Sequence, residues 1–299
     1  MRHLLNLNDL EAQEIFNIIT LAQKIKKNPD LYNKVLHRKT LIMLFEKPSL
    51  RTRLSFEIGM THLGGHAIYY DVTSSPLHKG KESLSDTAKV MSRMADIIMA
   101  RTYSHEKLEE FAGHSEVPVI NGLTDLYHPC QILGDLLTIK EKKNTLKASI
   151  AYYGDCRTNV ANSWMLASKK LNFKLILAGP NKPLKELFDK TKSNVTWVRN
   201  PKKVQPTDVV YTDSWMSYNI PAWKKTIRQI MFKKYQVNSN VMKRAKKNAI
   251  FMHDMPAIRG MEVTTEVIDG KQSIILDQAE NRLHIEKAIL IWLLKHKAY

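Results

Sequence analysis

Two arginines and two hydroxyl side chains follow a short apolar run near the N-terminal end of the chain. The run, residues 41–45, is typical of a buried strand, and the polar residues after it are Ser49, Arg51, Thr52 and Arg53. A helix that begins near Ser49 would point its unpaired amide groups and positive dipole end at any ligand over the turn, and arginine adds forked donors that match a phosphate. The spacing therefore predicts a phosphate site. The alternative is a surface charge cluster behind an ordinary N-cap serine.

A second motif, His128 to Gln131, opens a segment whose apolar residues recur at helical spacing. Pro129 fits the first turn of a helix, so His128 and Gln131 would both lie at its start. An imidazole can donate a hydrogen bond to a carbonyl oxygen, and a glutamine side chain can hold an amide group. Alone, the motif also fits a capping histidine with a polar first turn. Beside the phosphate loop it predicts recognition of a carbonyl or amide group.

The rest of the chain alternates strand-like and helical segments in two rounds. Predicted strands are residues 40–45, 66–71, 97–101 and 117–121, then 148–153, 174–178, 195–198, 208–212 and 249–253. Strands that alternate with helices of this length predict an α/β protein of two domains, each a parallel sheet flanked by helices. Ligands of such sheets bind beyond the carboxyl ends of the strands, where nearly all the motifs fall, so we expect the active site in the cleft between the domains.

The composition is that of a globular protein. A chain of 299 residues with 43% hydrophobic content can fill two cores. No apolar run approaches the roughly 18 to 20 residues that span a bilayer, and the N-terminal segment has acidic residues where a signal peptide has an apolar centre, so no membrane partner is expected. Cys130 and Cys156 are too few for a disulfide framework and fit free thiols in a reducing cytoplasm.

A formal net charge of +17 is also typical of nucleic-acid binders. The lysines, however, occur as scattered pairs, and the chain has no aromatic-rich RNA-binding signature, zinc finger or basic zipper. We interpret the charge as a solvated basic surface and expect no nucleic-acid partner. Such a surface would still attract a phosphorylated substrate, less strongly at high salt.

Four motifs, supported by a fifth short segment, occur in one order over nearly the whole chain. They are FEKPSLRTR from Phe45, HPCQ from His128, DSWMS from Asp213 and HDMPAIRGMEV from His253, with AENRLH at Ala279 to His284. In this combination the chain resembles the aspartate/ornithine carbamoyltransferase family and is most similar to its ornithine-specific members. The resemblance implies transfer of the carbamoyl group from carbamoyl phosphate to the δ-amino group of L-ornithine, giving L-citrulline and phosphate, with no metal and no other cofactor.

The resemblance also implies a domain organisation. Residues 1–143 would form the carbamoyl phosphate-binding domain, with the C-terminal helix, about 281–299, packed back on it. Residues 144–280 would form the ornithine-binding domain. Independently of the resemblance, the charge of residues 140–147 predicts that this stretch is the hinge between the domains. A homotrimer or a multiple of trimers is implied, in which a loop with His78 and Lys81 helps to hold phosphate in a neighbouring subunit.

Site residues follow from the matching positions. The donor-binding set is Ser49, Leu50, Arg51, Thr52, Arg101, His128, Gln131, Met255 and Arg282, and the ornithine-binding set is Asn159, Asp213, Ser217 and Tyr218. Within and beside these sets, the catalytic residues would be Arg101, His128, Gln131, Asp254 and Arg282. Arg53 is expected as a buried support of the phosphate loop, and Trp215 as a packing residue.

Two departures from the family pattern concern the acceptor. Tyr218 and Asn219 stand where the family usually has Met and Gly, and Asp254 stands where it has the Cys beside the attacking amine. A carboxylate there raises the pKa of the amine and opposes attack unless it also takes the proton. Our hypothesis is that Asp254 serves as a base or orienting acceptor. The alternatives are a carbamoyltransferase for another amine, such as putrescine or a modified ornithine, and a nonenzymatic basic binding protein that has kept the fold.

Overall fold

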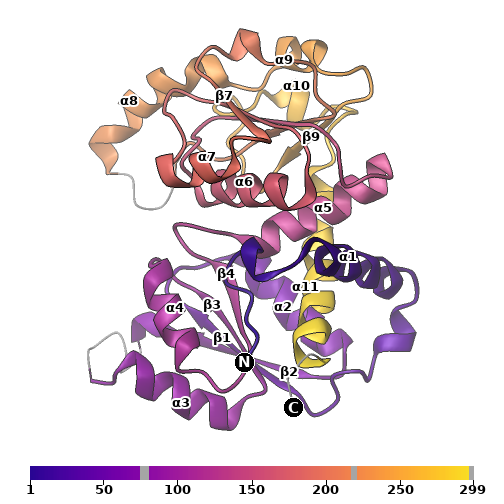
Figure 1. Ribbon diagram of the computed structural model, residues 1–299, viewed down its shortest axis with the longest axis vertical. Coiled ribbons are helices and arrows are strands. Elements are labelled where there is room, and N and C mark those ends of the chain that lie inside the picture. Colours follow the sequence, from indigo (N-terminus) through magenta and orange to yellow (C-terminus); the bar gives the residue numbers. More distant parts are fainter. Residues whose placement is uncertain (75–80, 217–220, 296–299) are drawn as a thin grey trace. The chain divides into compact units, whose positions relative to one another are not determined.

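The computed structural model describes residues 1–74, 81–216 and 221–295. The chain divides into two compact units, one formed by Met1–Leu137 with Glu280–Tyr299 and the other by Thr138–Ala279. Each unit contains one parallel sheet with flanking helices, which confirms the predicted fold class (Figure 1). None of the described helices is long and apolar enough to span a bilayer.

The first unit has a four-stranded sheet in the order β2-β1-β3-β4. Its elements are α1 (Ala12–Lys27), β1 (Thr40–Phe45), α2 (Leu50–His62), β2 (His66–Asp71), α3 (Leu84–Met94), β3 (Ile97–Arg101), α4 (His105–Gly113), β4 (Val119–Leu123) and the start of α5 (Pro129–Lys143), with short 3-10 helices at Leu7–Asp9, Pro29–Tyr32 and Val72–Ser74. The last strand begins two residues later than predicted, because Pro118 has no amide hydrogen to donate to the ladder.

Alternation along the strands decides which face each side chain covers. Ile42 and Leu44 of β1 pack with Ile98 of β3 against Leu108 and Phe111 of α4, in a cluster that α3 also joins. Figure 1 shows α2 and α11 (Ile275–Lys295) on the other side of this sheet. The two central strands of this sheet, β1 and β3, are therefore covered on both faces, which explains their continuous apolar sequences.

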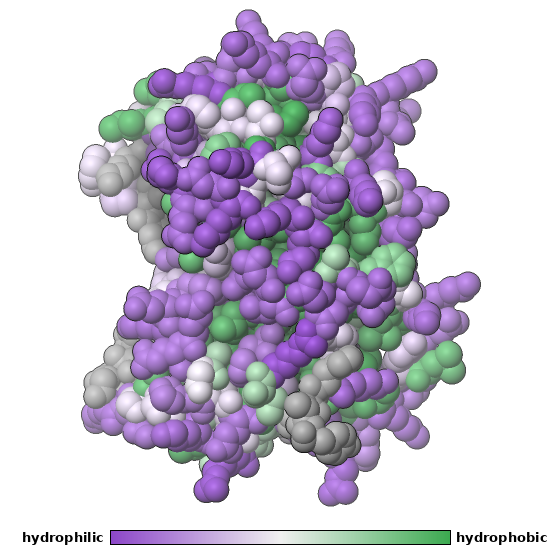
Figure 2. All heavy atoms as spheres, in the orientation of Figure 1, coloured by the Kyte–Doolittle hydropathy of each residue, from purple (hydrophilic) through white to green (hydrophobic). Residues whose placement is uncertain are grey.

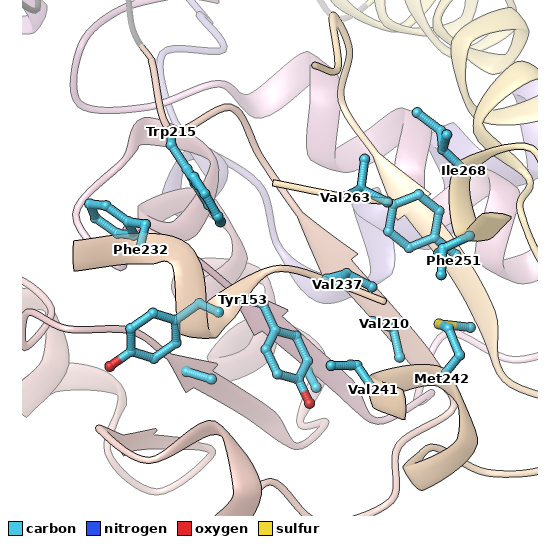
Figure 3. Close-up of a cluster of buried hydrophobic side chains, with 14 of the residues drawn as sticks. Tyr153, Val210, Trp215, Phe232, Val237, Val241, Met242, Phe251, Val263 and Ile268 are labelled. Carbon is cyan, nitrogen blue, oxygen red and sulfur yellow. The ribbon is translucent and has the colours of Figure 1, made fainter. Parts of the chain in front are cut away.

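The second unit has a five-stranded sheet in the order β7-β6-β5-β8-β9. Its elements are β5 (Ile150–Tyr153), α6 (Asn159–Leu171), β6 (Leu175–Ala178), α7 (Lys185–Thr191), β7 (Val195–Val198), β8 (Val209–Thr212), α8 (Ala222–Phe232), α9 (Ser239–Arg244), β9 (Ile250–His253), α10 (Thr265–Ile268) and the start of α11, with 3-10 helices at Pro201–Lys203 and Lys233–Tyr235. Figure 3 shows the core on one face of this sheet, where Tyr153, Val210 and Phe251 from three neighbouring strands meet Phe232 and Met242.

The surface reflects the composition. Hydrophilic side chains cover most of the face seen in Figure 2, as expected for a chain in which 25% of the residues are charged.

Candidate active site

The predicted phosphate loop lies just after the C-terminal end of β1, where α2 begins. Ser49 is the N-cap of α2, with an extended backbone (φ −160°, ψ 121°), and its Oγ accepts a hydrogen bond from the Thr52 amide at 3.3 Å. The Ser49 hydroxyl also donates to Thr52 Oγ1 at 3.1 Å. Leu50 is 70% exposed, and its contact with carbamoyl phosphate stays a prediction.

Arg101 reaches this loop because β3 pairs with β1. It lies directly opposite Phe45 in the ladder, and its side chain is only 6% exposed. Arg101 Nη1 donates to Thr52 Oγ1 at 3.3 Å. The sheet therefore places a buried guanidinium group beside the N-terminus of α2, and both features favour an anion.

His128, Gln131 and Arg282 form the second part of the site, and each is at most 3% exposed. Arg282 Nη1 of α11 donates to Gln131 Oε1 of α5 at 2.7 Å, although the two residues are 151 positions apart. Gly134 permits the close approach of the two helices, since a Cβ atom there would lie 3.3 Å from Arg282 Cδ. The structure thus joins residues that the sequence placed in separate motifs.

His128 is surrounded by cations. Burial lowers the pKa of His128 well below its ordinary value of 6.5, and the charges of Arg282, Arg101, Lys47 and Arg51 lower it further. The imidazole is therefore neutral near pH 7 and carries one N–H donor. A neutral ring can donate a hydrogen bond to a carbonyl oxygen while the neighbouring guanidinium groups supply the positive charge.

Replacing His128 by glutamine should make the free energy of unfolding less dependent on pH. In the wild type, the unfolded chain takes up the proton at about pH 6.5 and the folded protein only at lower pH, so stability is lost as the pH falls below about 6.5. Removal of the imidazole should reduce the slope of the free energy of unfolding against pH by up to about 1.4 kcal/mol per pH unit. Urea unfolding between about pH 5 and 7 measures the slope, with exposed His37→Gln as the control. Equal slopes for wild type and H128Q would contradict a buried neutral imidazole.

Lys47 is a cation of this region that sequence reasoning missed. It is 5% exposed, its Nζ lies 2.7 Å from Asp125 Oδ1, and it lies 4.3 Å from the centroid of the Tyr103 ring. Burial lowers the pKa of Lys47, although the hydrogen bond and charge of Asp125 oppose this shift. The sequence feature that could have identified Lys47 as a residue of this site is its position between β1 and Ser49.

The expectation of a buried Arg53 was wrong. Its side chain is 49% exposed, its Nε donates to Glu57 Oε1 at 2.9 Å, and its guanidinium lies 4.2 Å from the centroid of the Tyr69 ring. Arg51 and Arg53 are two positions apart on a helix and point in directions about 200° apart, so they cannot both face one buried site.

In the second unit, the predicted acceptor residues follow three neighbouring strands, β5, β8 and β9. Asp213 and Asp254 come directly after Thr212 and His253, which are partners in the pairing of β8 with β9. Asn159 is the first residue of α6, which follows β5. Because parallel strands end at the same edge of a sheet, these side chains belong to one edge.

The Asp213 carboxyl group is held at both oxygens. The Ser214 amide donates to Oδ1 at 2.6 Å, and the Tyr152 hydroxyl donates to Oδ2 at 3.5 Å. Tyr152 also lies 2.9 Å from the hydroxyl of Thr158, the N-cap of α6. Sequence reasoning missed Tyr152, which read as an ordinary strand residue.

Asp213 and Asp254 form a pair of carboxyl groups. Burial raises the pKa of Asp213 well above its ordinary range, and Asp254 raises it further through its charge and a hydrogen bond between the two side chains. Two carboxylates in contact repel each other when both are ionised, so a proton shared between them stabilises the pair. An ammonium group could take the place of that proton.

His253 lies between two acidic groups, with Nδ1 3.4 Å from Asp254 Oδ1 and Nε2 3.4 Å from Oε1 of the fully buried Glu262. Burial opposes a charged ring, but hydrogen bonds with Asp254 and Glu262 and the negative charges of Asp254 and Asp213 outweigh it and raise the pKa of His253 to about 9. The Met255 amide, 2.8 Å from Nδ1, favours the neutral ring, because Nδ1 must then accept its hydrogen bond. Whether the His253 ring is charged or neutral, its Nε2 carries a proton that faces Glu262. Glu262 was not singled out from the sequence.

Trp215 packs in the core, as predicted. It is 2% exposed, and its ring stacks on Phe232 with a centroid distance of 5.8 Å (Figure 3). Ser217, Tyr218 and His78 lie outside the described residues, so their roles stay predictions. The contact expected between Met255 and carbamoyl phosphate also stays a prediction.

Family comparisons cover both halves of the chain. Residues 2–141 match the carbamoyl-P binding domain of the aspartate/ornithine carbamoyltransferases, and residues 147–293 match their Asp/Orn binding domain. The chain therefore belongs to the aspartate/ornithine carbamoyltransferase family, which confirms the resemblance found in the sequence.

Relatives within this family narrow the comparison. The chain is 45% identical over 294 residues to the catabolic ornithine carbamoyltransferase of Halobacterium salinarum, covering 97% of this chain and 98% of that one. It is 44% identical over 302 residues to the anabolic ornithine carbamoyltransferase of Pyrococcus furiosus, covering 97% and 95%. The solved structure of the ornithine carbamoyltransferase from Pyrococcus furiosus matches with a TM-score of 0.93 at 42% identity over 99% of this chain and 98% of that one. The ornithine transcarbamoylase of Giardia lamblia matches with a TM-score of 0.89 at 39% identity over 100% and 99%.

Proposed function

We propose that the protein is an enzyme that transfers the carbamoyl group from carbamoyl phosphate to the δ-amino group of L-ornithine, giving L-citrulline and phosphate. The observation that carries this proposal is the buried group of Thr52, Arg101, His128, Gln131 and Arg282, in a chain that resembles ornithine carbamoyltransferases over nearly its whole length. In the reaction, the amine nitrogen bonds to the carbonyl carbon, the bond from that carbon to the phosphate oxygen breaks, and the amine loses a proton. The reaction as written needs no metal and no other cofactor.

On the donor side, the phosphate group lies over the N-terminus of α2. Ser49, Arg51 and Thr52 bind it together with the Leu50 amide, because these groups combine the helix dipole, hydroxyl donors and a forked cation. Arg101 contacts both the phosphate and the carbonyl oxygen.

Arg101, Thr52 and neutral His128 stabilise the carbonyl oxygen as it becomes anionic, with Arg282 nearby. Gln131 binds the amide of the carbamoyl group and so orients the carbon for attack.

On the acceptor side, Asn159 binds the amino-acid end of ornithine and Asp213 pairs with its α-ammonium group. Ser217 and Tyr218 complete this set. Asp254 lies beside the δ-amino group and accepts a proton from it, either as the base or as an orienting acceptor. The contact between Asp213 and Asp254 supports this arrangement, because one ammonium group can displace the shared proton and leave the second carboxylate as a proton acceptor.

The subunits form a homotrimer, or a multiple of trimers, in the cytoplasm. Leu50, Leu54 and Ile58 support association: they recur every fourth residue along α2 and are 70%, 44% and 38% exposed. The buried free thiols of Cys130 and Cys156 suit a reducing compartment. Light scattering on the purified protein should give a mass of three subunits or a multiple of it.

Phosphate release from carbamoyl phosphate, with ornithine, putrescine, aspartate and acetylornithine offered separately, tests the function. Ornithine should be the best acceptor. Putrescine has no α-carboxylate and would leave Asn159 without its anionic partner. A preference for putrescine or a modified ornithine would favour the alternative function, a carbamoyltransferase for another amine. The observation that favours this alternative is Asp254, which stands where the family has Cys.

A further inference from the structure

The side-chain amide of Gln131 is held at both ends by groups of opposite hydrogen-bonding type. Its Nε2 donates to Asp135 Oδ1 at 2.9 Å, and its Oε1 accepts from Arg282 Nη1 at 2.7 Å. A carboxylate only accepts and a guanidinium group only donates, so a single orientation of the amide satisfies both neighbours. Gln131 is 2% exposed and Asp135 is fully buried, so water cannot replace either partner at low cost.

Arg282 is itself fixed from the other side. Its Nε and Nη2 donate to Glu286 Oε1 at 3.0 Å and 2.5 Å, one turn further along α11, and Glu286 is fully buried. The pair is a charge-assisted contact in a buried environment, where such bonds are strong and directional. Asp135 on α5 and Glu286 on α11 thus hold opposite ends of one connected chain of hydrogen bonds.

We infer that Asp135 and Glu286 are positioning residues that orient the Gln131 amide, so that the enzyme recognises the amino group of the donor and rejects a methyl group in its place. The inference rests on the proposed function, in which Gln131 contacts the carbamoyl group. Arg282 uses one lone pair of Gln131 Oε1, and Asp135 uses one N–H of Gln131 Nε2. A second lone pair on Oε1 and a second N–H on Nε2 remain for a ligand. The NH2 and carbonyl oxygen of a carbamoyl group match these two positions.

Acetyl phosphate is the informative competitor. It has nearly the shape of carbamoyl phosphate but offers a methyl group where carbamoyl phosphate has NH2, so it leaves the buried Oε1 position unmatched. Sites built to hydrogen-bond a substrate N–H reject analogues without it for this reason. If the Gln131 amide could flip, so that Oε1 and Nε2 exchanged places, the discrimination between carbamoyl phosphate and acetyl phosphate should weaken. The flipped amide would no longer offer its oxygen to the NH2 group of carbamoyl phosphate.

The experiment compares Asp135→Ala with Asp135→Asn by initial-rate kinetics. Three constants are measured: the KM of carbamoyl phosphate, the Ki of acetyl phosphate and the Ki of inorganic phosphate, which needs only the phosphate loop. In D135A, the ratio of the acetyl phosphate Ki to the carbamoyl phosphate KM should fall about tenfold, as expected for the loss of one hydrogen bond to a charged group. The Ki of phosphate should stay within about twofold. D135N should remain near wild type, since its Oδ1 still accepts from Gln131 Nε2.

Thr138→Val is the matched control, because it removes another fully buried polar group from α5, about two turns beyond Gln131. It should keep the wild-type ratio. An unchanged ratio in D135A overturns the inference, and so does an equal weakening of all three constants, which would indicate general damage. If D135A does not fold, Glu286→Gln loosens Arg282 from the other side and must lower the same ratio. A folded wild-type protein that releases no phosphate with any acceptor overturns the proposed function itself.

Discussion

Replacing Arg101 by methionine should lower kcat/KM for carbamoyl phosphate about a thousandfold. Removal of one donor to a developing oxyanion costs about 10² to 10³ in rate, and Arg101 is proposed to contact the phosphate as well. The side chain is 6% exposed and placed by the pairing of β3 with β1, so no exposed cation can readily take its place. Arg101→Lys keeps the charge but not the fork and should recover only part of the loss. Initial rates with saturating ornithine measure these effects.

A second measurement separates a local effect from a loss of structure. Arg101 is one of the cations that lower the pKa of His128, so the pKa of His128 should rise in R101M when followed by NMR. The exposed Arg93→Met on α3 is the matched control and should leave both readouts at wild-type values. A value of kcat/KM within tenfold of wild type in R101M would remove Arg101 from the catalytic group.

Replacing Asp254 by asparagine should lower kcat with ornithine about a hundredfold at its plateau. In the wild type, the carboxylate can accept the proton of the attacking amine, and an amide cannot. The same substitution should move the acid limb of the kcat profile to lower pH. The reason is that a neighbouring carboxylate raises the pKa of the ammonium group, and without it the amine loses its proton at lower pH.

Asp254→Cys adds a second test of the same residue. It introduces the thiol found at this position in the resembled family, and it should show the same shift of the acid limb with a smaller loss of kcat. Asp269→Asn, which removes a half-exposed carboxylate paired with Arg259 at 2.7 Å, is the control and should leave the profile unchanged. If both Asp254 variants keep the wild-type profile, Asp254 takes no part in the transfer of the proton.

The sequence was informative where a local pattern carries a strong physical preference. Residues 40–45 were predicted as a buried strand and form β1, and a helix was expected to begin near Ser49, which is the N-cap of α2. His128 and Gln131 were expected at the start of a helix, and α5 begins at Pro129. Each of these predictions depends only on contacts between neighbours in the chain.

Burial and pairing were less accessible from the sequence. Arg53 was expected to be buried and is half exposed, whereas Lys47, three residues before the helix, is buried against Asp125. Asp135 and Glu286 were not singled out, because a carboxylate within a helix reads as a solvated residue until the neighbouring helix is placed. Asp254 was the exception, since its departure from the family pattern drew attention to it.

The chain by itself therefore determined its strands, its helix caps and the chemical types of its donor-binding groups, because these follow from spacing and from local hydrogen bonds. The tertiary structure decided which of those groups are dehydrated and how they are oriented. Gln131 and Arg282 are 151 positions apart, and the amide of Gln131 has a single favourable orientation only because α5 and α11 bring a carboxylate to one end and a guanidinium group to the other. Hydrogen bonds become strong and selective where packing excludes water, and packing joins residues that no local spacing can connect.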